Sequence, residues 1–255
     1  MATDVPDDIE AVSTSAMAIP PAIMVTCLER RNKQRADIAK HIFSNNIVLG
    51  APKQLEEAAK QYDLLRATWR LNVIPHAITI AGAGTELAWF KSLQFPEITS
   101  VSKSSLFKQK KEGKSVIPVW AGLDIQKGVY YHPNVSNHAM IDRFFLAEGA
   151  GENGRIRNCL VLYQDKVNAA GFTGAVAGLN RAANLVQQNC DGLSVLCIVN
   201  VIGASERTRR QKEFEFPYVV VRDAEVDGFY STQFAPAIRF LRERWLKILE
   251  ATKDE

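Results

Sequence analysis

Apolar residues follow two different spacings along this chain, and the changes between them predict its elements. Apolar positions recur every three or four residues, as in amphipathic helices, over residues 23–43, 55–69, 172–188 and 235–252. Short and nearly continuous apolar runs, typical of buried strands, occupy residues 116–120, 141–146, 159–167, 193–202 and 218–221. The pattern therefore predicts an α/β protein.

The first part of the chain differs from the rest. Residues 1–20 contain four acidic residues and no lysine or arginine, so we expect a disordered acidic leader there rather than a signal peptide. Residues 21–72 are expected to form an N-terminal helical region, and residues 73–255 the main domain. No stretch reaches the roughly 18 apolar residues of a membrane span, so we expect neither a transmembrane segment nor a membrane partner.

Two of the apolar runs carry polar residues whose spacing predicts a site. Asp142 lies in the run 141–146, while Gln164 and Lys166 end the run 159–167. Side chains alternate between the two faces of a strand, so Gln164 and Lys166 point to one face and Asp165 to the other. If the two runs pair as neighbouring strands, Asp142 converges with Gln164 and Lys166.

The residue types at this predicted site suit metal-dependent cleavage of phosphodiester bonds. A hard cation such as Mg²⁺ or Mn²⁺ takes oxygen ligands, here the Asp142 carboxylate and the Gln164 amide oxygen. Lys166 would lower the pKa of the attacking water or stabilise the charge that builds on phosphorus. The alternative is an ordinary ion pair between Asp142 and Lys166 at the strand ends.

Glu86 is a further candidate for this site. It follows the sequence GAGT at 82–85, which lacks the rest of a dinucleotide-binding or P-loop signature. One interpretation is a first-turn acid that the helix dipole favours. The other makes Glu86 a third metal ligand, beside Asp142 and Gln164.

Two basic segments are candidates for nucleic-acid binding. The first is expected to form a loop or hairpin arm before the run 116–120, and the second lies between two expected strands. Such charges usually only increase solubility, but two basic loops flanking one metal site would suit a grip on phosphates. Because the net charge is only +3, any such surface must be local. The candidate binding residues are Lys108, Lys110, Lys111, Arg207, Arg209, Arg210 and Lys212.

The cysteines and histidines do not indicate a zinc site. The four cysteines form no CxxC pair, and the four histidines show no HExxH or HxxxH spacing. We expect buried free thiols in a reducing compartment rather than disulfides or a structural zinc ion.

The expected order of elements is helix, strand, strand, strand, helix, strand (α-β-β-β-α-β), which is the core order of the restriction-endonuclease-like fold, a mixed β-sheet flanked by helices. Within that order, the segments 128–134 (GVYYHPN), 137–145 (NHAMIDRFF) and 162–164 (LYQ) carry a family resemblance. They resemble the C-terminal nuclease domain of Crinkler effectors and retrotransposon-hot-spot proteins. In that family a "YYxP…N…iDxff" phrase precedes an apolar strand ending in glutamine. The resemblance covers residues 129–185.

The resemblance implies the nuclease fold, and the first hypothesis is a magnesium-dependent endonuclease that acts on DNA, with RNA as the alternative substrate left open. It implies a location in the nucleus, the host's if the protein is a delivered effector, and otherwise in the cytoplasm. A homodimer follows only by analogy with this fold. Members often carry an upstream P-loop ATPase domain, but no GxxxxGK[ST] sequence occurs here, which argues against ATP-driven behaviour. The implied catalytic residues are Glu86, Asp142, Gln164 and Lys166.

Gln164 leaves more than one function open. An amide in place of a carboxylate removes one negative charge from the metal site and weakens metal binding unless Glu86 compensates. The alternative to an enzyme is therefore an inactive module of the same fold that binds nucleic acid or a protein partner. A third hypothesis is a domain that contacts a host protein through its two N-terminal helices.

Overall fold

The computed structural model divides the chain into two compact units, Met1–His41 and Ile42–Glu255. All residues described below belong to the second unit. The structure describes residues 51–104, 107–112, 115–120, 125–133, 138, 140–151, 154–166, 171–201, 214–230, 235, 238 and 239. The predicted acidic leader and the predicted helix at 23–43 lie outside this part of the chain.

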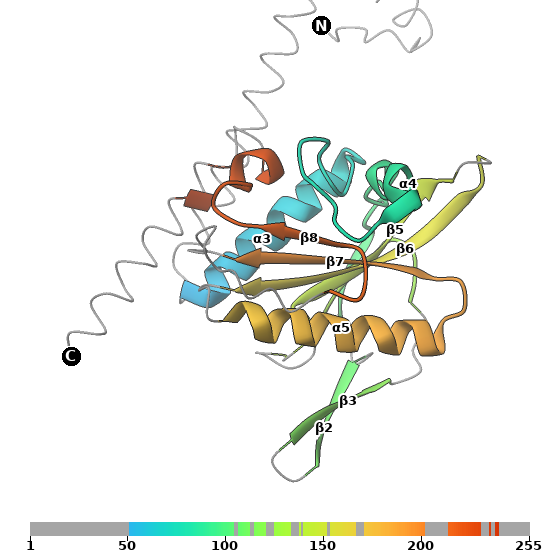
Figure 1. Ribbon diagram of the computed structural model, residues 1–255. Coiled ribbons are helices and arrows are strands. Elements are labelled where there is room, and N and C mark those ends of the chain that lie inside the picture. Colours follow the sequence, from blue (N-terminus) through green and yellow to red (C-terminus); the bar gives the residue numbers. More distant parts are fainter. Residues whose placement is uncertain are drawn as a thin grey trace, which may run out of the picture. The chain divides into compact units, whose positions relative to one another are not determined.

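A six-stranded mixed sheet forms the centre of the second unit (Figure 1). Its middle strands pair antiparallel, β4 with β5 and β5 with β6, whereas β1 runs parallel to β4, β7 to β6 and β8 to β7. The predicted runs at 141–146, 159–167, 193–202 and 218–221 are all strands of this sheet. In spatial order the strands are β1 (Ser100–Ser104), β4 (Val129–Pro133), β5 (Arg143–Ala150), β6 (Ile156–Lys166), β7 (Ser194–Val201) and β8 (Tyr218–Val221).

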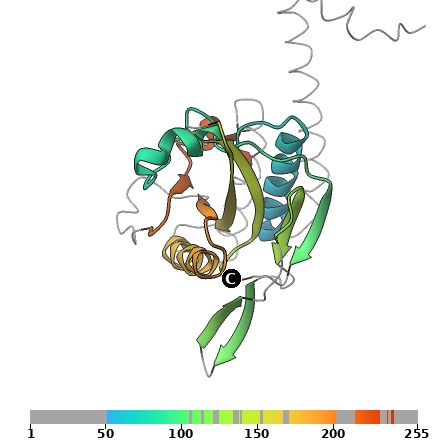
Figure 2. The same cartoon turned by 90° about the vertical axis from the view of Figure 1, so that its right-hand side faces the viewer.

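Helices cover both faces of the sheet, as Figures 1 and 2 show. Helix α3 (Ala51–Thr68) lies on one face and α5 (Phe172–Asn189) on the other. A short 3₁₀ turn, η2 (Gly84–Glu86), leads into the six-residue helix α4 (Leu87–Ser92). The architecture is therefore a mixed α/β sheet flanked by helices, as the sequence predicts.

The face under α5 is a mainly apolar core. Val176, Leu179, Ala183 and Val186 of α5 are fully buried, as their spacing predicts. They pack on alternate residues of the central strands, including Phe144, Leu146, Leu160, Leu162, Cys197 and Val199. Burying a side chain of this size contributes about 1.5–3 kcal/mol, so this layer supplies a large part of the drive to fold.

The face under α3 is more aromatic and also polar. The ring of Phe145 stacks on Phe95 and on Tyr130, with centroids 4.8 and 5.7 Å apart. From α3, the Tyr62 hydroxyl donates to the Phe229 carbonyl at 3.2 Å. We expected this helix to belong to a separate N-terminal region ending at residue 72, but it packs on the sheet. The boundary predicted between residues 72 and 73 is wrong for this helix.

The strand beside β5 is also not the one predicted. The run 116–120 falls in β3 (Ser115–Trp120), which pairs with β2 (Phe107–Glu112) in a separate two-stranded hairpin. The predicted hairpin arm is thus confirmed (Figure 2). The neighbour of β5 is instead β4, whose Tyr130 and Tyr131 lie opposite Phe145 and Phe144. Aromatic cross-strand pairs of this kind stabilise sheets.

The predicted helix at 235–252 is helical at Ala235, Ile238 and Arg239, and its remainder lies outside the described part. Ala235 and Ile238 are buried. None of the helices that the structure describes is long and apolar enough to cross a membrane.

Cys159 and Cys197 are buried free thiols, as expected, and Cys190 is a partly buried one. Burial raises the pKa of the Cys197 thiol, so this thiol stays protonated and unreactive. The fourth cysteine, Cys27, is not among the described residues.

Candidate active site

Asp142, Gln164 and Lys166 meet where β5 begins and β6 ends. The regular antiparallel register ends with Arg143 opposite Tyr163. One residue before β5, the Asp142 N–H donates to the Tyr163 carbonyl at 2.8 Å, so the one-to-one pairing does not continue to Gln164. Asp142 still lies beside the end of β6, where its carboxylate accepts from the Asp165 N–H at 2.6 Å. The structure therefore brings together the three residues that the strand pattern predicts.

Gln164 connects Lys166 to the segment that leads to Asp142. Its side chain is fully buried. In the orientation that satisfies both ends of the amide, Nε2 donates to the Met140 carbonyl at 3.0 Å and the oxygen accepts from Lys166 Nζ at 2.9 Å. The neutral amide oxygen thus accepts a charge-assisted hydrogen bond from the lysine ammonium, where a carboxylate would form an ion pair with it.

The surroundings of Asp142 disfavour its ionised form. Burial, the charge of Asp165 and the charge of Glu56 raise the pKa of Asp142 to about 7, against the lowering effects of the Asp165 backbone N–H and of Lys166. That N–H donates to Asp142 Oδ2 at 2.6 Å. A carboxyl group whose pKa is raised to near pH 7 is typical of functional sites.

Glu56 is a site residue that the sequence patterns missed. It lies on α3, and its charge acts on Asp142. Glu56, Ala59 and Asp63 are spaced to share one face of the helix, and Ala59 and Asp63 are each only 1% exposed. The signal in the sequence is the spacing of two acidic residues, Glu56 and Asp63, which lie seven positions apart on the same helix face as Ala59.

Glu86 does not join this site. It forms an ion pair with Arg157, with 2.8 Å between Oε1 and the guanidinium, near the start of β6. Seven residues separate Arg157 from Gln164 along β6, which is about 23 Å at about 3.3 Å per residue. Nearby, Trp89 of α4 packs on Gly149, where a side chain would collide with its indole nitrogen at 3.1 Å. The prediction that Glu86 contributes to the Asp142 site is therefore wrong in its geometry.

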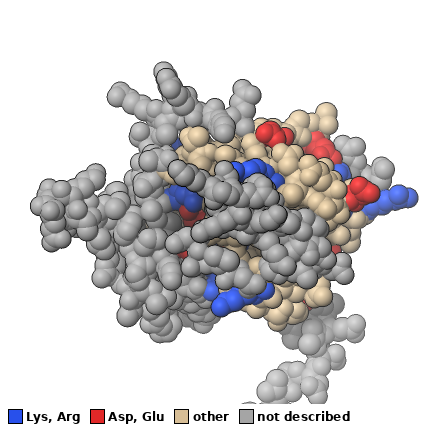
Figure 3. All heavy atoms as spheres, turned by 90° about the horizontal axis from the view of Figure 1, so that it is seen from below, with Lys and Arg blue, Asp and Glu red and all other residues tan. Residues whose placement is uncertain are grey.

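Only the first of the two basic segments predicted to bind nucleic acid lies within the described residues. Lys108, Lys110 and Lys111 lie in strand β2 of the hairpin. The second cluster, Arg207, Arg209, Arg210 and Lys212, lies outside the described residues. In the view of Figure 3, the described lysines and arginines are scattered and several have acidic side chains beside them. Within that view, the described surface gathers no single basic patch.

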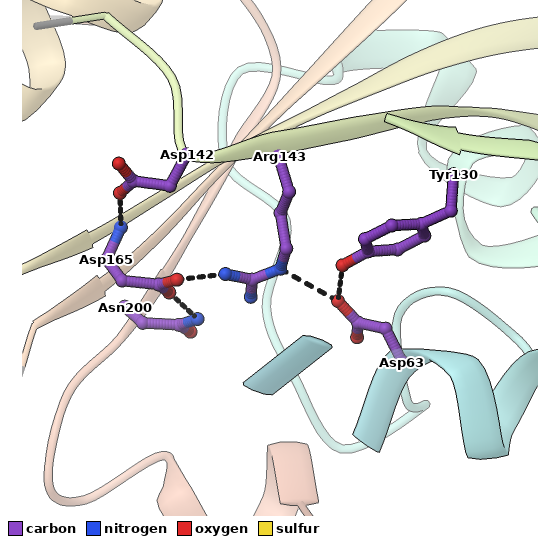
Figure 4. A network of polar contacts seen from close by, with 6 residues as sticks. All are labelled: Asp63, Tyr130, Asp142, Arg143, Asp165 and Asn200. Atoms are coloured by element: carbon purple, nitrogen blue, oxygen red, sulfur yellow. Dashed lines mark hydrogen bonds and ion pairs between the residues drawn. The ribbon is translucent and has the colours of Figure 1, made fainter. Parts of the chain in front are cut away.

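A chain of buried polar contacts runs on the α3 side of the same strands (Figure 4). Arg143 Nε donates to Asp63 Oδ2 at 3.0 Å, and its Nη1 donates to Asp165 Oδ2. Asn200 Nδ2 donates to Asp165 Oδ1 at 2.6 Å, and the Tyr130 hydroxyl to Asp63 Oδ2 at 2.9 Å. As predicted from strand alternation, Asp165 faces away from Gln164 and Lys166.

The donor set suits a hard divalent cation rather than zinc. Among the described residues, no group of three or more His, Cys, Asp or Glu side chains is arranged to hold a metal ion. Mg²⁺, however, is usually bound by one or two carboxylates together with waters and substrate phosphate oxygens. Asp142 would supply one carboxylate, and Glu56, whose charge acts on Asp142, would be the candidate for a second.

Comparison with protein-family models gave no match, and comparisons with curated proteins and with solved structures gave none either.

Proposed function

We propose that the chain is a metal-dependent endonuclease, with Asp142 and Glu56 as carboxylate ligands and Lys166 assisting the attack on phosphorus. The observation that carries this proposal is the placement of Asp142, Gln164 and Lys166 at one corner of the sheet, where β5 begins and β6 ends; the raised pKa of the buried Asp142 agrees with it. A site that gathers acidic groups and one ammonium around a buried carboxyl group suits phosphodiester cleavage. When bound, Mg²⁺ or Mn²⁺ supplies a Lewis acid and a water of lowered pKa.

The protein's own groups have distinct tasks in this proposal. The Asp165 N–H holds the Asp142 carboxylate in one orientation. Gln164 holds Lys166 through its amide oxygen, so the ammonium is placed before substrate binds. Preorganised charge of this kind stabilises the negative charge that develops on the phosphoryl oxygens.

The order of elements supports a restriction-endonuclease-like core. Helix α3 precedes the antiparallel strands β4, β5 and β6, which are followed by α5 and by β7 parallel to β6. With η2, α4 and strands β1–β3 set aside, which lie between α3 and β4, these elements follow the α-β-β-β-α-β order, with α3 in the place predicted for the helix of Glu86. The proposed kinship with Crinkler and retrotransposon-hot-spot proteins depends on that core and on the sequence phrase around Asp142, and the proposed nuclear location depends on the same kinship.

Cleavage of supercoiled plasmid DNA tests this function. With Mg²⁺ or Mn²⁺, the wild-type protein should produce nicked or linear DNA, and Lys166→Ala should reduce the rate about 100-fold or more. Lys127→Ala is the matched control, because Lys127 is an exposed lysine paired with Glu148 at 2.6 Å. Equal inactivity of all three proteins with both metals would reject the nuclease.

Gln164 favours a second candidate, an inactive module that binds nucleic acid. Its neutral amide oxygen accepts from Lys166, so Gln164 brings no negative charge to the site, where a carboxylate would. This candidate predicts slower migration of DNA in a gel without cleavage, and loss of that shift when Arg209, Arg210 and Lys212 are changed to Glu. A protein partner bound through α3 is less favoured, because the face with Ala59, Tyr62 and Asp63 is buried against the sheet.

A further inference from the structure

Arg143 stands between the two elements that surround Asp142. Its side chain is 4% exposed, and its two carboxylate partners, Asp63 and Asp165, are each 1% exposed. Asp63 belongs to α3 and Asp165 to the end of β6. One guanidinium therefore joins the helix to the strand, as Figure 4 shows.

Both partners of Arg143 lie beside groups that act on Asp142. Asp165 presents its side chain to Arg143 and its backbone N–H to Asp142 Oδ2, so the two contacts arise from a single residue. Asp63 lies seven residues after Glu56 on α3, about 10 Å along the axis and on the same face. Fixing Asp63 against the sheet therefore also fixes the height of Glu56 above the strands.

We propose that Arg143 is a positioning residue of the candidate site. Through Asp165 it aims the N–H that holds the Asp142 carboxylate. Through Asp63 it sets the place of Glu56, the second carboxylate. The planar guanidinium suits this task because Nε and Nη1 donate in fixed, different directions. A lysine ammonium in its place would keep the charge but would not hold both carboxylates in the same geometry.

The inference rests on the proposed function for its effect on metal binding, but not for its effect on Asp142. Groups that orient a metal ligand typically change metal affinity or activity by about 10- to 100-fold when they are lost. The hydrogen bond from the Asp165 N–H exists independently of any metal. Its strength can be followed by hydrogen exchange of that amide in the metal-free protein.

The test compares Arg143→Lys with Arg66→Lys. Arg66 is a matched control because it is similarly buried, with the whole residue 4% exposed against 3% for Arg143, and because it belongs to α3. Its hydrogen bonds go to the backbone carbonyls of Asn72 and Val73 rather than to an acid beside Asp142. Thermal melting measures the structural cost of each change, Mn²⁺ titration followed by electron paramagnetic resonance measures metal affinity, and NMR measures exchange of the Asp165 amide.

Both variants should lower the melting temperature. Only Arg143→Lys should weaken Mn²⁺ binding, by about tenfold, and speed exchange at the Asp165 amide. If the two variants change both quantities equally, or if Arg143→Lys folds and changes neither, Arg143 has only a structural role. If the wild-type protein binds no Mn²⁺ and cuts no DNA, the proposed function fails, whereas amide exchange still decides the role of Arg143.

A second variant covers the case in which Arg143→Lys does not fold. Asp165→Asn keeps the backbone N–H and weakens the hold of Arg143, but it also removes a negative charge that raises the pKa of Asp142. Amide exchange, and not Mn²⁺ affinity, therefore decides the result. We expect faster exchange at residue 165 in a protein that still folds, and unchanged exchange would overturn the proposal.

Discussion

Strand β6 carries charged residues near both of its ends, and their surroundings are opposite. Near its start, Arg157 and Glu86 form an ion pair with side chains 43% and 44% exposed. Near its end, Arg143 and Asp165 form one with 4% and 1% exposed. An exposed pair contributes about 0–1 kcal/mol, whereas each buried charge costs several kcal/mol in desolvation. The buried end is thus the one where the charges need a functional reason.

The largest expected difference between the two ends concerns stability. Arg143→Met leaves two carboxylates buried without their cation, so the free energy of unfolding should fall by about 3–5 kcal/mol. Urea denaturation measures this loss. Changing the partner acids in the same protein, as in Asp63→Leu with Arg143→Met, should restore part of it. A loss below about 1 kcal/mol for Arg143→Met would place this pair in the same class as the exposed one.

The next difference is a pH dependence of stability, which we expect from Asp142 at the buried end of β6. Because the pKa of Asp142 is raised to about 7, the folded state binds a proton that the unfolded chain has released. The stability that this proton provides is complete below about pH 4 and is lost as the pH rises to about 7. Without divalent metal, Asp142→Asn should therefore be more stable than wild type at pH 8, by up to about 4 kcal/mol at about 1.4 kcal/mol per pKa unit.

Chemical denaturation at pH 5 and at pH 8 in the presence of a chelator measures this pH effect. The difference between the two proteins should be small at pH 5 and should grow toward pH 8. Addition of Mg²⁺ at pH 8 should stabilise wild type and not Asp142→Asn, because a ligand stabilises only the state that binds it. A wild type that is equally stable at both pH values would contradict the raised pKa.

A third comparison replaces the two glutamates. Glu56→Gln removes a carboxylate from the Asp142 end and should weaken Mn²⁺ binding about tenfold. Glu86→Gln changes an exposed pair at the other end and should leave the affinity unchanged. Calorimetric titration with Mn²⁺ gives both values. If Glu86→Gln has the larger effect, the arrangement of α3 over the site is wrong.

The smallest effect is expected for Arg157→Met, which breaks the exposed ion pair. The pair and the stacking of the Arg157 guanidinium on Trp89, 4.1 Å from the ring centroid, should together contribute about 1 kcal/mol. The contribution of the ion pair should fall further at 1 M salt, because salt screens exposed charges. Denaturation at two salt concentrations checks this prediction.

Local patterns were sufficient for much of the fold and for three site residues. Strands β6, β7 and β8 and helix α5 lie within a few residues of the predicted ranges, because unbroken apolar runs and a regular helical stripe are strong signals. The convergence of Asp142 with Gln164 and Lys166 follows from strand alternation and from pairing of two runs that are close in sequence.

The remaining site residues depend on contacts between distant parts of the chain. Asp63 and Arg143 lie 80 positions apart, and no local spacing shows that α3 packs on β5 and β6. Without that contact, no local spacing marks Glu56 as a site residue, and Glu86 is predicted to be closer to the site than it is. The polar network of Asp63, Arg143, Asp165 and Asn200 was missed for the same reason.

The last residues of β6 place polar side chains on both faces of the strand. Gln164 and Lys166 point to one layer, while Tyr163 and Asp165 point to the other. Deletion of a single residue in β6 before Gln164 would exchange these sets, because a one-residue slip turns every following side chain over. Evolution can therefore alter this strand by substitution but not by insertion or deletion, and a lineage that abandoned the chemistry would still have to conserve its spacing.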